Sequence, residues 1–330
     1  MRRREFIGLI SSVAAAWPFA ASAQQSERIR HVGALIAYAE KDSIGRAAAA
    51  AFKAGLERLG WIEGKNIRVD YRFAAGDPAL YRIFAAELVG LSPDAILAGA
   101  TPAVVALQPL TRTIPIVFVL VADPVGLGFV QSLARPGGNI TGFSVYDDQI
   151  MGKWLELFNK MAPSVRRIAV IFNPDAAPFA DLFNKSIERA ALSLGIVVAL
   201  APVHDDAGIQ EAVSTQARMP GAGILVLPES FSISHRKTII AAAAKFNVPA
   251  VGASDVFPRD GGLMSYWIDT ILEYSRAASY IDRILKGAGP ANLPVQQPTK
   301  FSLIINLSTA KTLGLVIPPD VLALADEVIE

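Results

Sequence analysis

The sequence contains no cysteine. This absence excludes disulfide bonds, thiolate metal sites and cysteine nucleophiles, and it excludes lipid attachment at a signal-peptide cysteine. A chain of this size can be stable without disulfides, so the absence is compatible with export. Histidine is also scarce: the three residues His31, His204 and His235 are scattered and give no metal-ligand spacing.

The motifs of common α/β enzymes are missing as well. No Gly-x-Ser-x-Gly nucleophile elbow occurs in the chain. Gly126-Leu-Gly128 lacks the third glycine of a dinucleotide-binding loop and lies inside a predicted helix. We therefore predict no catalytic residues, no metal and no cofactor, and a protein that is not an enzyme.

The chain has no strong excess of either charge, with 31 basic and 30 acidic residues. A balanced charge gives no electrostatic footprint for nucleic acid or for an anionic membrane surface. Hydrophobic residues make up 52% and charged residues 18% of the sequence, which predicts large buried cores and excludes a disordered chain.

The first residues have the layout of a secretory signal peptide. Arg2–Arg4 are basic, an apolar stretch runs over Phe6–Ala16, and Ala21–Ala23 is a small-x-small cleavage site. The apolar stretch is too short for a retained membrane anchor. We predict that residues 1–23 are removed before Gln24 and that the protein is released into the periplasm without a lipid. Residues 3–7 resemble the twin-arginine signal, so both the twin-arginine and the general secretory route stay open.

The rest of the sequence alternates short β-branched apolar runs with longer amphipathic stretches. This pattern predicts an α/β protein with parallel sheets and helices on both faces. We predict strands at 31–38, 67–73, 94–98, 115–121, 140–144, 167–172, 196–200, 222–227, 249–252, 262–267 and 302–306. We predict helices at 45–60, 78–91, 102–110, 125–134, 149–161, 179–194, 207–218, 233–246, 269–287 and 320–328.

So many strands favour two sheets over one. The break between them is expected near 143–148, after the turn cluster at 135–139. Gly- and Pro-rich segments at 286–290 and 293–298 follow a late helix. They indicate that the chain crosses between two lobes more than once, as in a hinge.

Several motifs together resemble the tryptophan/tyrosine-type ABC transporter substrate-binding family, and they cover nearly all of the chain after residue 23. They are Gly60–Asn66, Asp70–Phe73, Thr113–Phe118, Asp123–Val125, Ser132–Gly142, Pro298–Phe301, Ile305–Leu307, Thr309–Lys311 and Ala325–Ile329. The resemblance implies the type I periplasmic binding protein fold, in which two Rossmann-like lobes joined by three hinge strands close on a small ligand. We expect one lobe at 29–144 plus 268–291 and the other at 145–267 plus 292–330.

The resemblance also implies a function. It suggests the periplasmic substrate-binding component of an ABC-type importer, a monomer that captures an aromatic or related amino acid and delivers it to permease and ATPase subunits. The same fold can instead serve a ligand sensor that feeds a signalling receptor, and this alternative stays open. The chain departs from the family at Ala75, where the family often has Glu, and at 37–42.

Ligands of open α/β sheets lie beyond the carboxyl ends of the strands, which selects the candidate site residues. Thr101 is expected to cap a helix whose first residue is Pro102, and free N–H groups there could hold a ligand carboxylate, or Thr101 could act only as a cap. Asp123 could pair with a ligand ammonium or could cap the next predicted helix.

Further candidates follow other strands. In the second lobe Asn173, Glu229, Ser230 and Asp255 occupy strand ends, and in the first lobe Tyr38 and Glu40 lie on the first loop. Tyr266, Trp267 and Asp269 lie at a predicted crossover between the lobes, where an aromatic ring could stack on a ligand or pack the hinge, and Tyr266 is the candidate that we select there.

Overall fold

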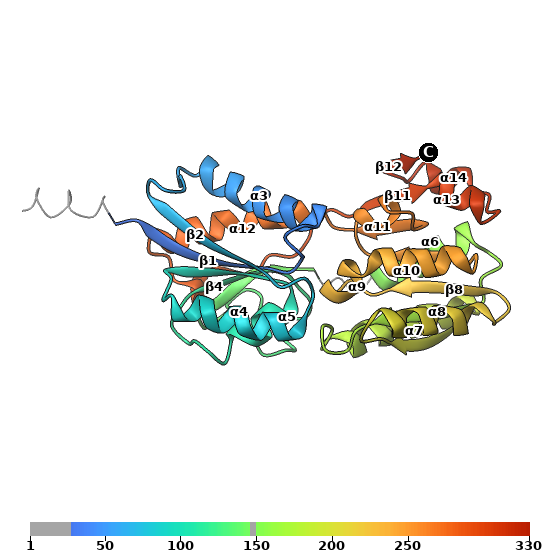
Figure 1. Ribbon diagram of the computed structural model, residues 1–330, viewed down its shortest axis with the longest axis horizontal. Coiled ribbons are helices and arrows are strands. Elements are labelled where there is room, and N and C mark those ends of the chain that lie inside the picture. Colours follow the sequence, from blue (N-terminus) through green and yellow to red (C-terminus); the bar gives the residue numbers. More distant parts are fainter. Residues whose placement is uncertain (1–27, 146–149) are drawn as a thin grey trace, which may run out of the picture.

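The computed structural model describes residues 28–145 and 150–330 (Figure 1). The predicted signal peptide at 1–23 lies outside these residues. In the part of the chain that is described, no helix is both long enough and apolar enough to cross a membrane.

The first half of the molecule is built on a five-stranded parallel sheet with the order β2-β1-β3-β4-β5. Its strands are β1 (Arg30–Ile36), β2 (Ile67–Phe73), β3 (Ala95–Gly99), β4 (Ile116–Val121) and β5 (Ile140–Ser144). Its helices are α3 (Ser43–Arg58), α4 (Pro78–Gly90), α5 (Thr101–Leu107) and α12 (Thr270–Leu285). Helices α3 and α12 pack together on one side of the sheet, and α4 and α5 pack on the other (Figure 1).

The second half is built on a seven-stranded sheet with the order β12-β11-β10-β9-β8-β6-β7. Its strands are β6 (Arg167–Phe172), β7 (Val197–Pro202), β8 (Ala222–Val226), β9 (Ala250–Gly252), β10 (Met264–Trp267), β11 (Ser302–Asn306) and β12 (Glu327–Ile329). Its helices are α6 (Ile150–Met161), α7 (Ala180–Leu194), α8 (Asp206–Ala217), α9 (Ser230–Ser234), α10 (Arg236–Lys245), α11 (Val256–Arg259), α13 (Leu307–Thr312) and α14 (Pro319–Leu322). A 3-10 turn, η2 (Pro290–Asn292), precedes β11.

The side chains of the central strands alternate between the two faces of the sheet, so the second half has two hydrophobic cores, one on each face. Ile168 and Val170 of β6 join the core of α6 and α7, whereas Ile171 joins the core of α8 and α10. Successive side chains of a strand point to opposite faces, so a continuous apolar run is buried on both sides. This is why the β-branched runs of the sequence mark the strands of this fold so clearly.

The chain passes between the two sheets three times: after β5, between β10 and α12, and between η2 and β11. Two of these passages lie side by side, since Gln296 N donates to Gly142 O (2.9 Å) and Ser144 N donates to Gln296 O (2.8 Å). Two of the three connections are therefore hydrogen-bonded to each other, and the halves are not joined by one loose linker.

The predicted helix at 125–134 is wrong. The segment forms turns, in which Leu127 N donates to Asp123 O (3.0 Å) and Asp123 Oδ1 accepts from Gly126 N (2.8 Å). Gly128 has a φ of +70°, a conformation that ends a helix, and two glycines in three residues weaken helix formation.

The predicted helix at 320–328 is also wrong in its second part, and the expected all-parallel pairing has an exception. After α14 the chain forms β12, because Asp326 N donates to Leu303 O and Leu303 N donates to Asp326 Oδ2, both at 2.9 Å. Pairing with β11 thus overrides local helix preference.

Strands β10 and β11 are antiparallel, since the chain re-enters the second sheet from the first half.

Candidate ligand-binding site

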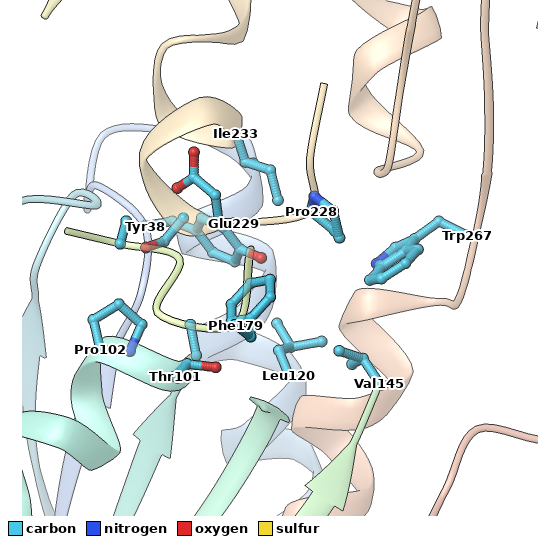
Figure 2. Close-up of a pocket in the computed structure, with 13 residues that line it drawn as sticks. Tyr38, Thr101, Pro102, Leu120, Val145, Phe179, Pro228, Glu229, Ile233 and Trp267 are labelled. Atoms are coloured by element: carbon cyan, nitrogen blue, oxygen red, sulfur yellow. The ribbon is translucent and has the colours of Figure 1, made fainter. Parts of the chain in front are cut away.

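A pocket lies where the carboxyl ends of the two sheets face each other (Figure 2). Its walls come from both halves of the molecule. The lining residues from the first half and the segment directly after β5 are Tyr38, Ala100, Thr101, Pro102, Leu120 and Val145. Those from the second half are Ala176, Phe179, Pro228, Glu229, Ser230, Ile233 and Trp267. Each lies in or just after a strand, or on the helix that follows, as expected for open α/β sheets.

Three aromatic rings surround this space. Figure 2 shows Tyr38, Phe179 and Trp267 around the same opening. Trp267 is backed by the buried Trp154, with ring centroids 5.7 Å apart and ring planes tilted by 53°. Trp154 is itself fixed, because its Nε1 donates to Tyr266 O at 2.5 Å. Trp267 therefore presents to the pocket an aromatic surface that its neighbours hold in place.

The start of α5 differs from its prediction. Ala100, not Thr101, is the N-cap residue, and its φ of 68° with ψ of 164° is unusual for a residue with a side chain. Such strain costs about 1–3 kcal/mol and is typical of ligand-binding loops. Thr101 Oγ1 accepts from Ala122 N (3.4 Å), which ties this loop to the end of β4.

The same loop offers fewer free N–H groups than expected. Ala100 N donates to Val119 O (2.9 Å) and Ala103 N donates to Ala100 O (3.2 Å). Pro102 has no N–H. The start of α5 therefore has fewer free N–H donors to bind a ligand carboxylate than its sequence suggested.

Glu229 has a structural role at the pocket wall. Its carboxylate is the cap of α9, accepting from Phe231 N (2.5 Å) and Ser232 N (2.8 Å), and it also accepts from Asn173 N (3.3 Å). Burial raises the pKa of Glu229 from 4.5 to about 7, although these hydrogen bonds favour the ionised form.

This pKa predicts a pH-dependent stability. The folded carboxyl binds its proton more tightly than the unfolded one, so stability present at low pH is lost as the pH rises through about 7. Glu229→Gln keeps the side-chain shape without titrating. The unfolding free energy of the wild type should fall, relative to that of Glu229→Gln, between about pH 4.5 and about pH 7 in urea titrations. A difference that is independent of pH would contradict the buried-carboxyl interpretation.

Tyr38 is fully enclosed. Its burial, with the neighbouring Tyr274 and Tyr81, raises the pKa of the Tyr38 hydroxyl well above its usual value. The hydroxyl is therefore neutral at physiological pH and can donate a hydrogen bond.

The structure brings together Tyr38, Thr101, Glu229 and Ser230 among the residues selected from sequence. Asn173 stands directly behind the wall. Its Oδ1 accepts from Asp175 N (2.8 Å) and from Ala176 N (3.1 Å), which positions the pocket residue Ala176.

Four other candidates do not line the pocket. Glu40 is exposed to solvent, and the Asp123 carboxylate is engaged in the turn described above. Asp255 lies 3.7 Å from the guanidinium of Arg259. The ring of Tyr266 stacks on Phe301, with centroids 5.7 Å apart. The packing interpretation of Tyr266 is thus the one that fits this geometry.

Two aromatic pocket residues are not among the selected candidates: Trp267, which the sequence placed at the crossover beside Tyr266, and Phe179. Trp267 follows Tyr266 in β10, and neighbouring strand residues point to opposite faces, so only one of them can face the pocket. Phe179 lies in the loop before α7, and its apolar neighbourhood in sequence gives no signal that separates a pocket residue from a core residue.

The fold and this pocket define the class: a solute-binding protein built from two α/β halves with a pocket between them. The fold class of two mostly parallel sheets with flanking helices, predicted from sequence, is confirmed. In the described residues no group of three or more His, Asp or Glu side chains could hold a metal ion.

Residues 33–329 match the family described as ABC transporter substrate binding protein, and the chain belongs to that family. The family is one of solute-binding proteins rather than enzymes.

Three similar proteins carry further information. The tyrosine-binding protein of Clostridioides difficile is 28% identical over 277 residues, covering 84% of this chain and 79% of that protein. A conserved domain protein from Vibrio cholerae is 32% identical with a TM-score of 0.84, covering 91% of this chain and 100% of that one. An ABC domain from Streptococcus pneumonia in complex with L-Trp is 25% identical with a TM-score of 0.83, covering 91% and 99%.

Proposed function

We propose that this protein is the periplasmic substrate-binding component of an ABC importer and that it captures an aromatic amino acid, or a closely related carboxylate-bearing molecule, in the pocket between its halves. The observation that carries the proposal is the aromatic pocket itself, walled by Tyr38, Phe179 and Trp267 from both sheets. Similarity to a tyrosine-binding protein and to a protein in complex with L-Trp supports the same ligand class.

The polar ligand contacts that we propose are the hydroxyl groups of Tyr38, Thr101 and Ser230, which line the pocket beside the three rings. A neutral hydroxyl can donate to a carboxylate or accept from an ammonium group. Glu229 adds negative charge to the wall when it is ionised, which favours a ligand that carries an ammonium group.

Hinge closure is part of the proposal. The room left for water in the pocket is about 20 Å³, the space of roughly one molecule, against roughly 300–1,000 Å³ for typical ligand pockets. An aromatic ligand therefore enters only if the halves separate. We propose that 29–144 plus 268–291 move as one lobe and 145–267 plus 292–330 as the other, about the three passages of the chain.

Export and delivery complete the proposal. The basic, apolar and small-residue segments of 1–23 support cleavage before Gln24 and release into the periplasm. There the closed, loaded form would dock on permease subunits powered by an ATPase, as a monomer. No catalytic step is required, only more favourable ligand contacts in the closed state than in the open one.

A thermal-shift panel tests the ligand class. L-tryptophan, L-tyrosine, their deaminated acids and L-leucine are added at equal concentration. A ligand at 100 times its Kd stabilises the folded state by about 2.7 kcal/mol, which should raise the melting temperature by several degrees. We expect the aromatic amino acids to give the largest shifts. If neither the amino acids nor the deaminated acids move the melting temperature, the proposed ligand class is wrong.

A further inference from the structure

One buried arginine joins the two halves outside the pocket. Arg236, the first residue of α10, forms a two-pronged ion pair with Asp42, the cap of α3 in the other half. Arg236 Nη1 lies 2.7 Å from Asp42 Oδ2, and Nη2 lies 2.9 Å from Asp42 Oδ1. The starts of α3 and α10 lie where the two halves face each other (Figure 1). The planar guanidinium matches a carboxylate in this geometry, which makes the contact directional as well as charged.

Arg236 also has partners within its own half. Its Nε donates to Asp260 Oδ2 at 2.7 Å, and its Nη1 donates to Ile233 O at 2.9 Å. The side chain is 3% exposed. A buried charge without a partner is costly, so these two contacts keep the guanidinium satisfied and oriented when Asp42 moves away. The Asp42 contact can therefore form and break without leaving an orphaned charge.

Both ends of this contact continue directly into the pocket wall. Asp42 ends the loop that begins at Tyr38, and the loop is tightly packed, since a side chain on Gly45 would lie 2.1 Å from Ala39 O. On the other side, Ile233, whose carbonyl accepts from Arg236, lines the pocket itself. The ion pair thus fixes two pocket elements from opposite halves relative to each other.

We propose that Asp42 and Arg236 form an interlobe latch that stabilises the closed conformation and so sets ligand affinity without touching the ligand. Asp260 is a positioning residue, because it holds the guanidinium ready for Asp42. This inference rests on the hinge closure proposed above.

Asp42→Asn is a sharp test variant. Asn caps a helix as well as Asp does, so α3 keeps its cap while the charge and the two-pronged pairing are lost. We expect the Kd for L-tryptophan, measured by calorimetry, to rise about tenfold, the scale of lost charge-assisted hydrogen bonds. Arg236→Lys keeps the positive charge but loses the planar guanidinium that pairs with both carboxylate oxygens. It should give a smaller increase in Kd.

Asp77→Asn is the matched control. Asp77 caps α4 in the same half, accepting from Ala79 N at 2.7 Å, and is exposed. This variant removes the same charge from an equivalent cap that lies outside the latch, so its Kd should equal that of the wild type. An equal loss of affinity in Asp42→Asn and Asp77→Asn would mean a general charge effect and would overturn the latch.

A second measurement reads closure without any ligand. Because the sequence contains no cysteine, Ala86→Cys in α4 and Ala241→Cys in α10 provide two exposed and unique sites for spin labels. In the ligand-free protein we expect a closed population in the distance distribution that Asp42→Asn loses. Identical distributions in the two proteins, whether both open or both closed, would overturn the latch.

The two proposals fail in different ways. If the wild type does not bind L-tryptophan, the ligand class is wrong, and the ligand-free distance measurement still decides the latch. If L-tryptophan binds equally well to the wild type and to Asp42→Asn, the latch is wrong and the ligand class stands.

Discussion

Gly76→Ala is expected to weaken the binding of L-tryptophan by about ten- to a hundredfold. Gly76 lies in the first half, and a Cβ atom on it would lie 2.6 Å from Ser230 O and 2.9 Å from Phe231 N in the second half. These neighbours are backbone atoms at the start of α9, so they cannot rotate away. The methyl group should therefore hold the halves apart and oppose closure on the ligand.

Gly64→Ala is the matched control for this variant. Gly64 has a φ of +79°, close to the +75° of Gly76, but a Cβ there meets no atom within 4 Å. Both variants force an alanine into a left-handed backbone conformation, which is destabilising, whereas only Gly76→Ala introduces the clash. Calorimetry should show an unchanged Kd for Gly64→Ala. An unchanged Kd for Gly76→Ala as well would mean that the two halves need not approach this closely when the ligand is bound.

Trp154→Ala should lower the free energy of unfolding by about 3–5 kcal/mol and also weaken ligand binding by the protein that remains folded. Trp154 is 1% exposed, so its removal leaves a large cavity in the core behind α6. It also leaves Trp267, a pocket residue, without the ring that supports it. Urea unfolding measures the first effect, and calorimetry of folded protein measures the second.

Phe158→Ala separates the two effects. Phe158 lies one turn further along α6 and is equally buried, but it packs in the core away from the pocket. It should lose comparable stability while keeping the affinity of the wild type. If Trp154→Ala also keeps full affinity, the support that it gives to Trp267 is not important for binding.

Much of the fold could be predicted because its strands are buried on both faces. Strands β6 and β11 have the predicted bounds, since a continuous apolar run can satisfy both sheet surfaces only in the interior of a layered structure. The predicted helices at 125–134 and in the second part of 320–328 failed for two different reasons. Glycine conformation decided the first, and pairing of Asp326 with Leu303, far away in sequence, decided the second.

The candidate site was harder to predict than the fold. The strand-end rule locates the loops around the pocket, which is how Tyr38, Thr101 and Ser230 were found. It does not say which way each side chain turns. Asp123 bonds within its own turn, a local role that its sequence position also allowed, and Asp255 turns toward Arg259 at the i,i+4 spacing. Contacts across the two halves, such as Asp42 with Arg236, join residues 194 positions apart and leave no trace in the local sequence pattern.

A crystal structure of the protein grown with L-tryptophan tests the central claim most directly. The account predicts ligand density between Tyr38, Phe179 and Trp267, with the carboxylate or ammonium group in contact with side chains of both halves. Ligand density at another site, or an empty pocket at saturating L-tryptophan, would contradict it.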